Sequence, residues 1–308
     1  MALRGLIVVV VLASTGCDGR SRYTGDGPTA TPWASPPPSP PALSTDGWHG
    51  HLSGHVDGLG DADGLLTSDG LMRLRLADNG PPDHDVPENQ LVAHLDFDID
   101  ENRAFGTGVI IGQLCATPSR SVFCDEPGHA EISLTATTGN SAQRDFEVTG
   151  ELRVTTSRGD ETWPLTLGYT EGSWKTGPSE GRGYGYDGPA SLDSTAGVFR
   201  EDHAEFGDVD DTVINIDRAG RLFFQSPNSG CVGNGALAPH LDGRYNVYDV
   251  ELTIENCGAT HAHLNGKFEG LASHDSYDYM SIWLIMWLST TDDAPSRAAL
   301  NLWGAPIY

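Results

Sequence analysis

Lysine is almost absent from this chain of 308 residues, in which Lys175 and Lys267 are the only two. Lysine and arginine together number 18 against 43 aspartate and glutamate residues, so that the formal net charge is −25. A surface this acidic repels nucleic-acid phosphates and anionic lipid headgroups. We therefore expect no nucleic-acid partner, and we interpret the charge as a means of keeping the folded part of the chain soluble.

Signatures of catalysis are also missing. The sequence contains no GxSxG, HExxH or P-loop motif, and it has no GxGxxG between a strand and a helix. The glycine-rich stretch GRGYGYDG at residues 181–188 is followed by no helical pattern and is typical of a loop. We expect a protein that is not an enzyme and that has no cofactor.

Helical periodicity is the third absence. No segment after residue 17 keeps a helical period of hydrophobic residues over three turns, whereas several segments alternate with a period of two. The clearest of them are LVAHLDFDI (91–99), DFEVTGELRV (145–154) and VYDVELTI (247–254). Bounded by Gly, Asp, Asn and Pro, these patterns predict half-buried antiparallel strands. The expected fold class is all-β, as an antiparallel meander, a barrel or a sandwich.

A weak repeat predicts two similar domains. LDFDIDENRAFGTG (95–108) and TVINIDRAGRLFFQ (212–225) share a strand, an Ile-Asp pair, a short polar turn with an arginine and a second strand. Residues 170–195 between them are rich in Gly, Ser, Tyr and Pro, as expected of a junction. We predict a first β domain over residues 46–180 and a second over residues 181–308. The alternative is one large sandwich or barrel that uses all the strands.

The N-terminus predicts export and a lipid anchor. Arg4 precedes the apolar run Leu6–Ala13, which is typical of a secretory signal and too short for a stable membrane span. The sequence STGC that follows resembles a bacterial lipobox, although Ser14 stands where leucine is most common. The resemblance implies a signal peptide over residues 1–17, lipidation of Cys17 and a membrane partner bound through that lipid. The alternative is an ordinary signal peptide cut elsewhere.

Residues 18–45 predict a disordered linker. They are dominated by Pro, Ser, Thr and Gly, a composition that cannot bury a core. In extended geometry they would hold the folded part up to ~90 Å from the bilayer. The expected location is the bacterial cell envelope, with the choice between inner and outer membrane left open.

The remaining cysteines predict two disulfides. Cys115, Cys124, Cys231 and Cys257 are an even number, as is common in an exported protein. We favour Cys115–Cys124 and Cys231–Cys257, because each pair then lies within one half of the chain. The alternative, a metal site of four thiolates, normally uses CxxC spacings that are absent here.

The C-terminal half carries a wider resemblance, over residues 208–308. Its three segments are IDRAGRLFFQSPNSGCVGNGAL, YNVYDVELTIENCGATHAHLNGKFEGLA and SIWLIMWLSTTDDAPSRAALNLW. They resemble the small β-barrel domains of uncharacterised bacterial lipoproteins, in which one cysteine precedes a glycine-containing strand and a second follows a Val/Leu/Ile strand. The resemblance implies a meandering barrel and no activity.

Two patterns are candidate binding sites. His49, His51 and His55 in HGHLSGH would share one face of a strand, where neutral imidazoles could bind Zn²⁺ or Cu²⁺. Exposed histidines with no role are the alternative. Trp283 and Trp287 in SIWLIMWL also share a face. They would belong to a strand buried in a barrel wall or beneath a neighbouring domain, or would line a ligand cavity.

These observations together predict a lipid-anchored envelope protein with a binding, structural or interaction role. The alternative is a carrier or scavenger of a small apolar ligand or of a transition metal.

Overall fold

The computed structural model describes most of the chain after residue 47. The described residues are 48–77, 89–98, 101–112, 123, 126–140, 145–169, 186, 188–200, 212–275, 283–290 and 299–306. The predicted signal peptide, Cys17 and the predicted linker lie outside them. All the strands belong to one compact unit, residues 41–308.

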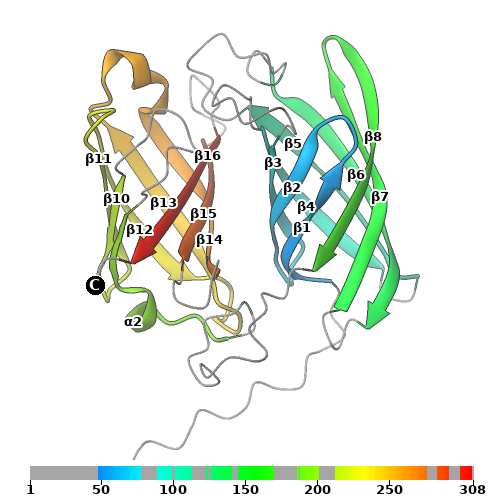
Figure 1. Ribbon diagram of the computed structural model, residues 1–308, viewed down its shortest axis with the longest axis horizontal. Helices are drawn as coiled ribbons and strands as arrows, with labels where there is room; N and C mark the ends of the chain where they lie inside the picture. The colour runs from blue at the N-terminus through cyan, green and yellow to red at the C-terminus, as the bar shows by residue number, and fades with distance from the viewer. Residues whose placement is uncertain are drawn as a thin grey trace, which may run out of the picture. The chain divides into compact units, whose positions relative to one another are not determined.

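The first eight strands form a closed antiparallel barrel, drawn in blue to green in Figure 1. Each strand pairs with the next along the chain, and pairing between the first strand and the eighth closes the barrel. The strands are β1 (Gly50–Val56), β2 (Gly60–Leu66), β3 (Leu71–Ala77), β4 (Asn89–Asp98), β5 (Arg103–Gly112), β6 (Gly128–Asn140), β7 (Asp145–Thr156) and β8 (Gly159–Tyr169).

Alternation along the strands places their apolar side chains inside the barrel. In β4, Leu91, Ala93 and Leu95 are buried in the core, whereas His94 and Asp96 are exposed on the outer face. Strand β7 follows the same pattern. The period-two prediction is therefore confirmed for these strands, and the all-β fold class with it.

Glycines at several inward positions let neighbouring strands approach closely. A Cβ atom on Gly54, Gly64 or Gly150 would lie 2.0, 2.0 or 1.9 Å from a carbonyl oxygen of the adjacent strand. Gly106 and Gly108 in β5 are equally crowded, at 2.2 and 2.1 Å. Only a residue without a side chain fits at these positions, so the glycines allow the sheet to curl tightly.

A second antiparallel barrel follows, drawn in yellow-green to red in Figure 1. Its strands pair in chain order, and the last strand pairs with the first through Ala305 with Arg200 and Pro306 with Phe199. The strands are β9 (Gly197–Arg200), β10 (Val213–Ile216), β11 (Arg221–Ser226), β12 (Cys231–Pro239), β13 (Val247–Glu255), β14 (Gly266–Asp275), β15 (Trp283–Thr290) and β16 (Ala299–Pro306).

Two short helical segments lie among the described strands. They are α2 (Leu192–Thr195), which precedes β9, and the 3₁₀ helix Ala259–Leu264, which connects β13 to β14. The strands therefore divide between two separate barrels, and the alternative of one barrel or sandwich using all of them is wrong. Residues 180 and 181, where we predict the domain boundary, lie outside the described residues.

The predicted repeat is a pair of matching hairpins, β4–β5 and β10–β11. Asn102 and Gly220 lie in their turns with positive φ angles of 52° and 78°. Three residues later in the chain, Phe105 and Phe223 lie on the outer faces and are 45% and 48% exposed. The hairpin uses the fourth and fifth strands of the first barrel but the second and third strands of the other, so the repeat does not follow strand order.

Candidate functional site

The three histidines of the predicted metal site lie in different surroundings. His51 is buried on the outer face of β1, and His49 is buried just before that strand. His55 is partly exposed near the other end of β1, with ring nitrogens 3.5 Å from Asp57 and 3.4 Å from Asp61. No three His, Cys, Asp or Glu side chains among the described residues are placed to hold a metal ion together.

His51 connects the two barrels through a hydrogen bond. Its Nε2 lies 3.0 Å from the Oγ of Ser273 in β14. The Ser273 hydroxyl donates its hydrogen to the carbonyl of Asn246 at 2.8 Å. Since a hydroxyl has a single hydrogen to donate, His51 Nε2 is the donor in the first bond, and the other ring nitrogen carries no proton in the neutral form.

An aromatic cluster surrounds these histidines. The rings of Tyr186 and Tyr245 are stacked at a centroid distance of 5.0 Å, and His49 lies 4.7 Å from Tyr245. His51 lies 6.0 Å from Trp287 of β15. These rings belong to a buried region that also contains apolar side chains from the outer faces of both barrels: Leu65, Val247, Leu271 and Ile285. We call this region the inter-barrel cluster.

Trp287 belongs to the inter-barrel cluster and not to a barrel interior. It is 1% exposed, whereas the side chains of β15 that enter the core of the second barrel are Leu284, Met286 and Leu288. The expectation of a strand beneath a neighbouring domain is therefore confirmed for Trp287. The idea that Trp287 lines a ligand cavity inside the barrel is wrong. Nothing is described of the side chain of Trp283.

A buried arginine lies at the same contact. Arg73 of β3 is 5% exposed and donates hydrogen bonds to Ser289 Oγ at 3.1 Å and to Gln90 Oε1 at 3.4 Å. Burial lowers the pKa of Arg73 to about 10, against the opposing effect of the Glu269 carboxylate. The guanidinium still carries its charge at neutral pH, and its two hydrogen bonds offset part of the cost of removing it from water.

His240 bridges two carboxylates at the edge of this contact. Its Nε2 lies 3.1 Å from Asp69, in the turn between β2 and β3, and its Nδ1 lies 2.7 Å from Asp249 in β13. Burial acts to lower the pKa of His240, but hydrogen bonds to the two carboxylates outweigh it, so the pKa is raised. A neutral imidazole has one N–H, so only the protonated ring can donate to both carboxylates.

A second polar network lies inside the barrel formed by β9–β16. His274 Nε2 lies 3.0 Å from Thr195 Oγ1, which is also 2.8 Å from the hydroxyl of Tyr248. Tyr248 donates to Asn246 Oδ1 at 3.0 Å. Burial lowers the pKa of His274 to about 4, and the nearby His51 acts in the same direction. His274 is therefore neutral in the folded protein at pH 7.

Acid is expected to destabilise the protein through His274. An unfolded histidine binds a proton near pH 6.5, but the folded ring does so only near pH 4. Stability from this group is thus intact above pH 6.5 and falls by about 3 kcal/mol as the pH drops to 4. Urea unfolding of the wild type and of His274→Gln between pH 7 and pH 4 measures the effect. The variant should lose less stability over this range, and equal losses would contradict the assignment.

Apolar side chains make up most of the interior of each barrel. In the first barrel, inward residues of all eight strands form one continuous buried cluster, which includes Met72, Leu91 and Leu152. In the second barrel, the corresponding cluster includes Phe224, Tyr248 and Phe268, each no more than 3% exposed. Eight-stranded barrels have an interior that side chains alone can fill, and both of these are packed in that way.

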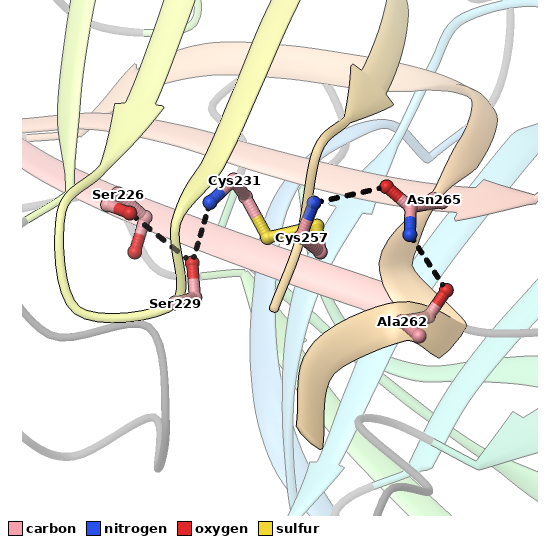
Figure 2. The surroundings of a disulfide bond; sticks show 6 residues. All are labelled: Ser226, Ser229, Cys231, Cys257, Ala262 and Asn265. Atoms are coloured by element: carbon pink, nitrogen blue, oxygen red, sulfur yellow. Dashed lines mark hydrogen bonds between the residues drawn. A yellow bond between two sulfur atoms is a disulfide. The ribbon is translucent and has the colours of Figure 1, made fainter. Parts of the chain in front are cut away.

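The predicted disulfide Cys231–Cys257 is confirmed. It joins the start of β12 to the segment directly after β13, over a sequence separation of 26 (Figure 2). Ser229 accepts a hydrogen bond from the Cys231 amide, and Asn265 accepts one from the Cys257 amide, so that both ends are held (Figure 2). A four-thiolate metal site is therefore wrong, because two of its sulfur atoms are bonded to each other. Cys115 and Cys124 lie outside the described residues.

The contact between the barrels combines residues that the sequence patterns singled out, such as His51 and Trp287, with others that they did not. Arg73 and His240 belong to no motif, and Tyr186 lies in the glycine-rich stretch 181–188 that was predicted only as a loop. The run of apolar residues around Trp287 was the one signal for a doubly buried strand. Across the part of the chain that is described, no helix has the length and hydrophobicity needed to span a membrane. No family model, curated protein or solved structure matches this chain.

Proposed function

We propose that this chain is a lipid-anchored protein of the bacterial cell envelope that binds a partner through the outer surface of its barrels and catalyses no reaction. The packing of the barrel interiors carries the proposal. Because mostly apolar side chains fill both interiors, the surface that remains for a partner is the outside of the strands and their connections. Strands of a filled barrel hold outward side chains at fixed spacings, which suits recognition.

The carrier alternative has less in its favour. A carrier of a small apolar molecule needs an interior space, whereas the inward apolar side chains of the described strands form one continuous buried cluster in each barrel. A transition-metal scavenger would need His49, His51 and His55 to converge, whereas His51 donates to Ser273 and His55 lies beside aspartates. The outer-surface role accounts for the packing without a further assumption.

The anchor rests on Cys17, and its replacement tests the proposal. Cys17→Ser should leave the two barrels folded but move the protein from the membrane fraction to the soluble fraction, or leave its signal peptide uncut. Cell fractionation with detection of the protein by immunoblot measures the distribution, and metabolic labelling with a fatty acid measures lipidation. We expect most of the wild type in the membrane fraction, and the variant either in the soluble fraction or as the uncut, unlipidated precursor.

Ser21→Ala, four residues away, is the matched control and should behave as the wild type. A Cys17→Ser protein that is processed to the wild-type size and still sediments with membranes would refute the anchor.

A further inference from the structure

One face of the second barrel carries no carboxylate on its strands. The outward positions of β9, β10, β11 and β12 include no aspartate or glutamate. The next strand, β13, returns to an acidic outer face with Asp249, Glu251 and Glu255. Strands β15 and β16 also contain no carboxylate. The charged outward side chains of β9–β12 are Arg200 and Arg221, and Arg221 is paired with Asp217 in the preceding turn.

An aromatic ring between two amides lies across the middle of this face. In the registers of β10–β11 and β11–β12, Phe223 is directly opposite Asn215 on one side and Asn234 on the other. Residues directly opposite each other in antiparallel strands have Cβ atoms about 5 Å apart. All three side chains are exposed, and Phe223 keeps 48% of its surface in solvent. We call this row the amide–phenyl ladder.

The matching hairpin of the first barrel provides an internal comparison. There Phe105 is 45% exposed, but its opposite residues are Asp96 and Ser133. The ring is therefore common to both hairpins, whereas the flanking amides belong to the second barrel alone. Asp96 and its counterpart Asn215 are both exposed. A partner would therefore meet a carboxylate beside the ring of the first barrel and an amide beside the ring of the second.

The chemistry of the ladder suits an uncharged polyhydroxyl partner. The face of an aromatic ring carries partial negative charge and attracts the C–H groups on one side of a sugar ring. A primary amide offers two donors and an acceptor, so it can hydrogen-bond to adjacent hydroxyl groups. The strands of this face carry no carboxylate, the guanidinium of Arg221 is paired with Asp217, and the amides carry no charge that would select an ionic ligand.

We propose that the amide–phenyl ladder of Asn215, Phe223 and Asn234 binds a neutral oligosaccharide. The inference rests on the proposed function as a binding protein and names the class of its ligand. The ring of Phe223 packs against a sugar, and the two amides fix its orientation from either side. Nearby uncharged side chains extend the platform along the strands, with Gln225 opposite Val232, which is 37% exposed. A shallow platform of this size binds weakly, with Kd on the order of 0.1–1 mM.

Oligosaccharide binding is tested on the full chain, in a detergent without a sugar headgroup. The probes are maltohexaose, cellohexaose and the hexamer of N-acetylglucosamine, with a hexamer of galacturonic acid as the anionic comparison. Saturation-transfer NMR detects binding, and calorimetric titration gives Kd. We expect at least one neutral probe to bind and the anionic probe not to bind.

The variants separate the ladder from the rest of the surface. Phe223→Ala and the isosteric Asn215→Asp should each weaken binding by about tenfold or more. Phe105→Ala, the matched control in the first barrel, should leave Kd unchanged. The proposal is overturned if none of the three neutral probes binds at about 10 mM, ten times the weakest expected Kd. It is also overturned if Phe223→Ala and Phe105→Ala weaken binding equally.

Self-association is the competing use of the face. If sedimentation shows that the chain dimerises and that Phe223→Ala abolishes the dimer, the occupant is a second copy and the oligosaccharide proposal is wrong. These outcomes concern the ligand alone. The membrane anchor is scored separately by fractionation of Cys17→Ser, so failure of one proposal leaves the other measurable.

Discussion

Gly150→Ala is expected to lower the free energy of unfolding by about 3 kcal/mol, because the added methyl group has no room. Its Cβ would lie 1.9 Å from the carbonyl oxygen of Ser133 and 3.0 Å from the Cα of Leu134, both in the backbone of β6. Backbone atoms cannot rotate away as a side chain can. Strands β6 and β7 would have to separate, and the hydrogen bonds between them would be strained or lost.

Gly168→Ala is the matched control in the neighbouring strand β8. Its added methyl group would meet nothing closer than the Ser53 carbonyl oxygen at 3.9 Å, an ordinary contact. Alanine also loses less backbone entropy than glycine on folding, so this variant should be as stable as the wild type or slightly more stable. Urea unfolding followed by circular dichroism compares the two. Similar stability of Gly150→Ala and Gly168→Ala would show that β6 and β7 are not as close as described.

Loss of the Cys231–Cys257 disulfide is the second large effect that we expect. The bridge closes a loop with a sequence separation of 26, and removing such a constraint costs about 3 kcal/mol in the loop-entropy model. Cys257→Ser should therefore unfold at a lower urea concentration than the oxidised wild type. The variant also leaves Cys231, which is fully buried, as a free thiol at the end of the barrel.

Reductant provides the control for this experiment. It should lower the stability of the wild type by more than that of Cys257→Ser, in which only the predicted Cys115–Cys124 bridge remains to be reduced. If the variant loses as much stability as the wild type when reductant is added, another disulfide accounts for the effect. Peptide mapping without reduction should recover Cys231 joined to Cys257.

The strands and their inward faces were predictable from the sequence because burial follows the two-residue period. In β13, Tyr248, Val250 and Leu252 alternate with Asp249 and Glu251 in the sequence and in the structure. The Cys231–Cys257 pair was predicted because both cysteines lie in the same half of the chain, and the structure places them at the ends of the paired strands β12 and β13. The repeat predicted two similar domains but not that each closes into a barrel. Closure depends on pairing between the first and last strands of each barrel, and strands so far apart leave no local pattern in the sequence.

The contact between the barrels could not be read from the sequence. A period of two assigns residues to two faces but does not say what covers the outer face. Leu65 and Leu71, on outer-facing positions of β2 and β3, are apolar for a reason that becomes visible only when β15 lies against them. The histidines illustrate the same limit, because the spacing of His49 and His51 predicts a shared face whether the neighbour is a metal ion, Tyr245 or Ser273.

The inter-barrel cluster also constrains how the sequence of this protein can change. Leu65 and Trp287 are each surface residues of their own barrel, yet both are buried, at 0% and 1% exposed. A smaller side chain on one barrel would leave a gap that only a larger side chain on the other could fill. A substitution at one of these positions therefore favours a compensating substitution at the other, although the two lie more than 200 residues apart in the chain.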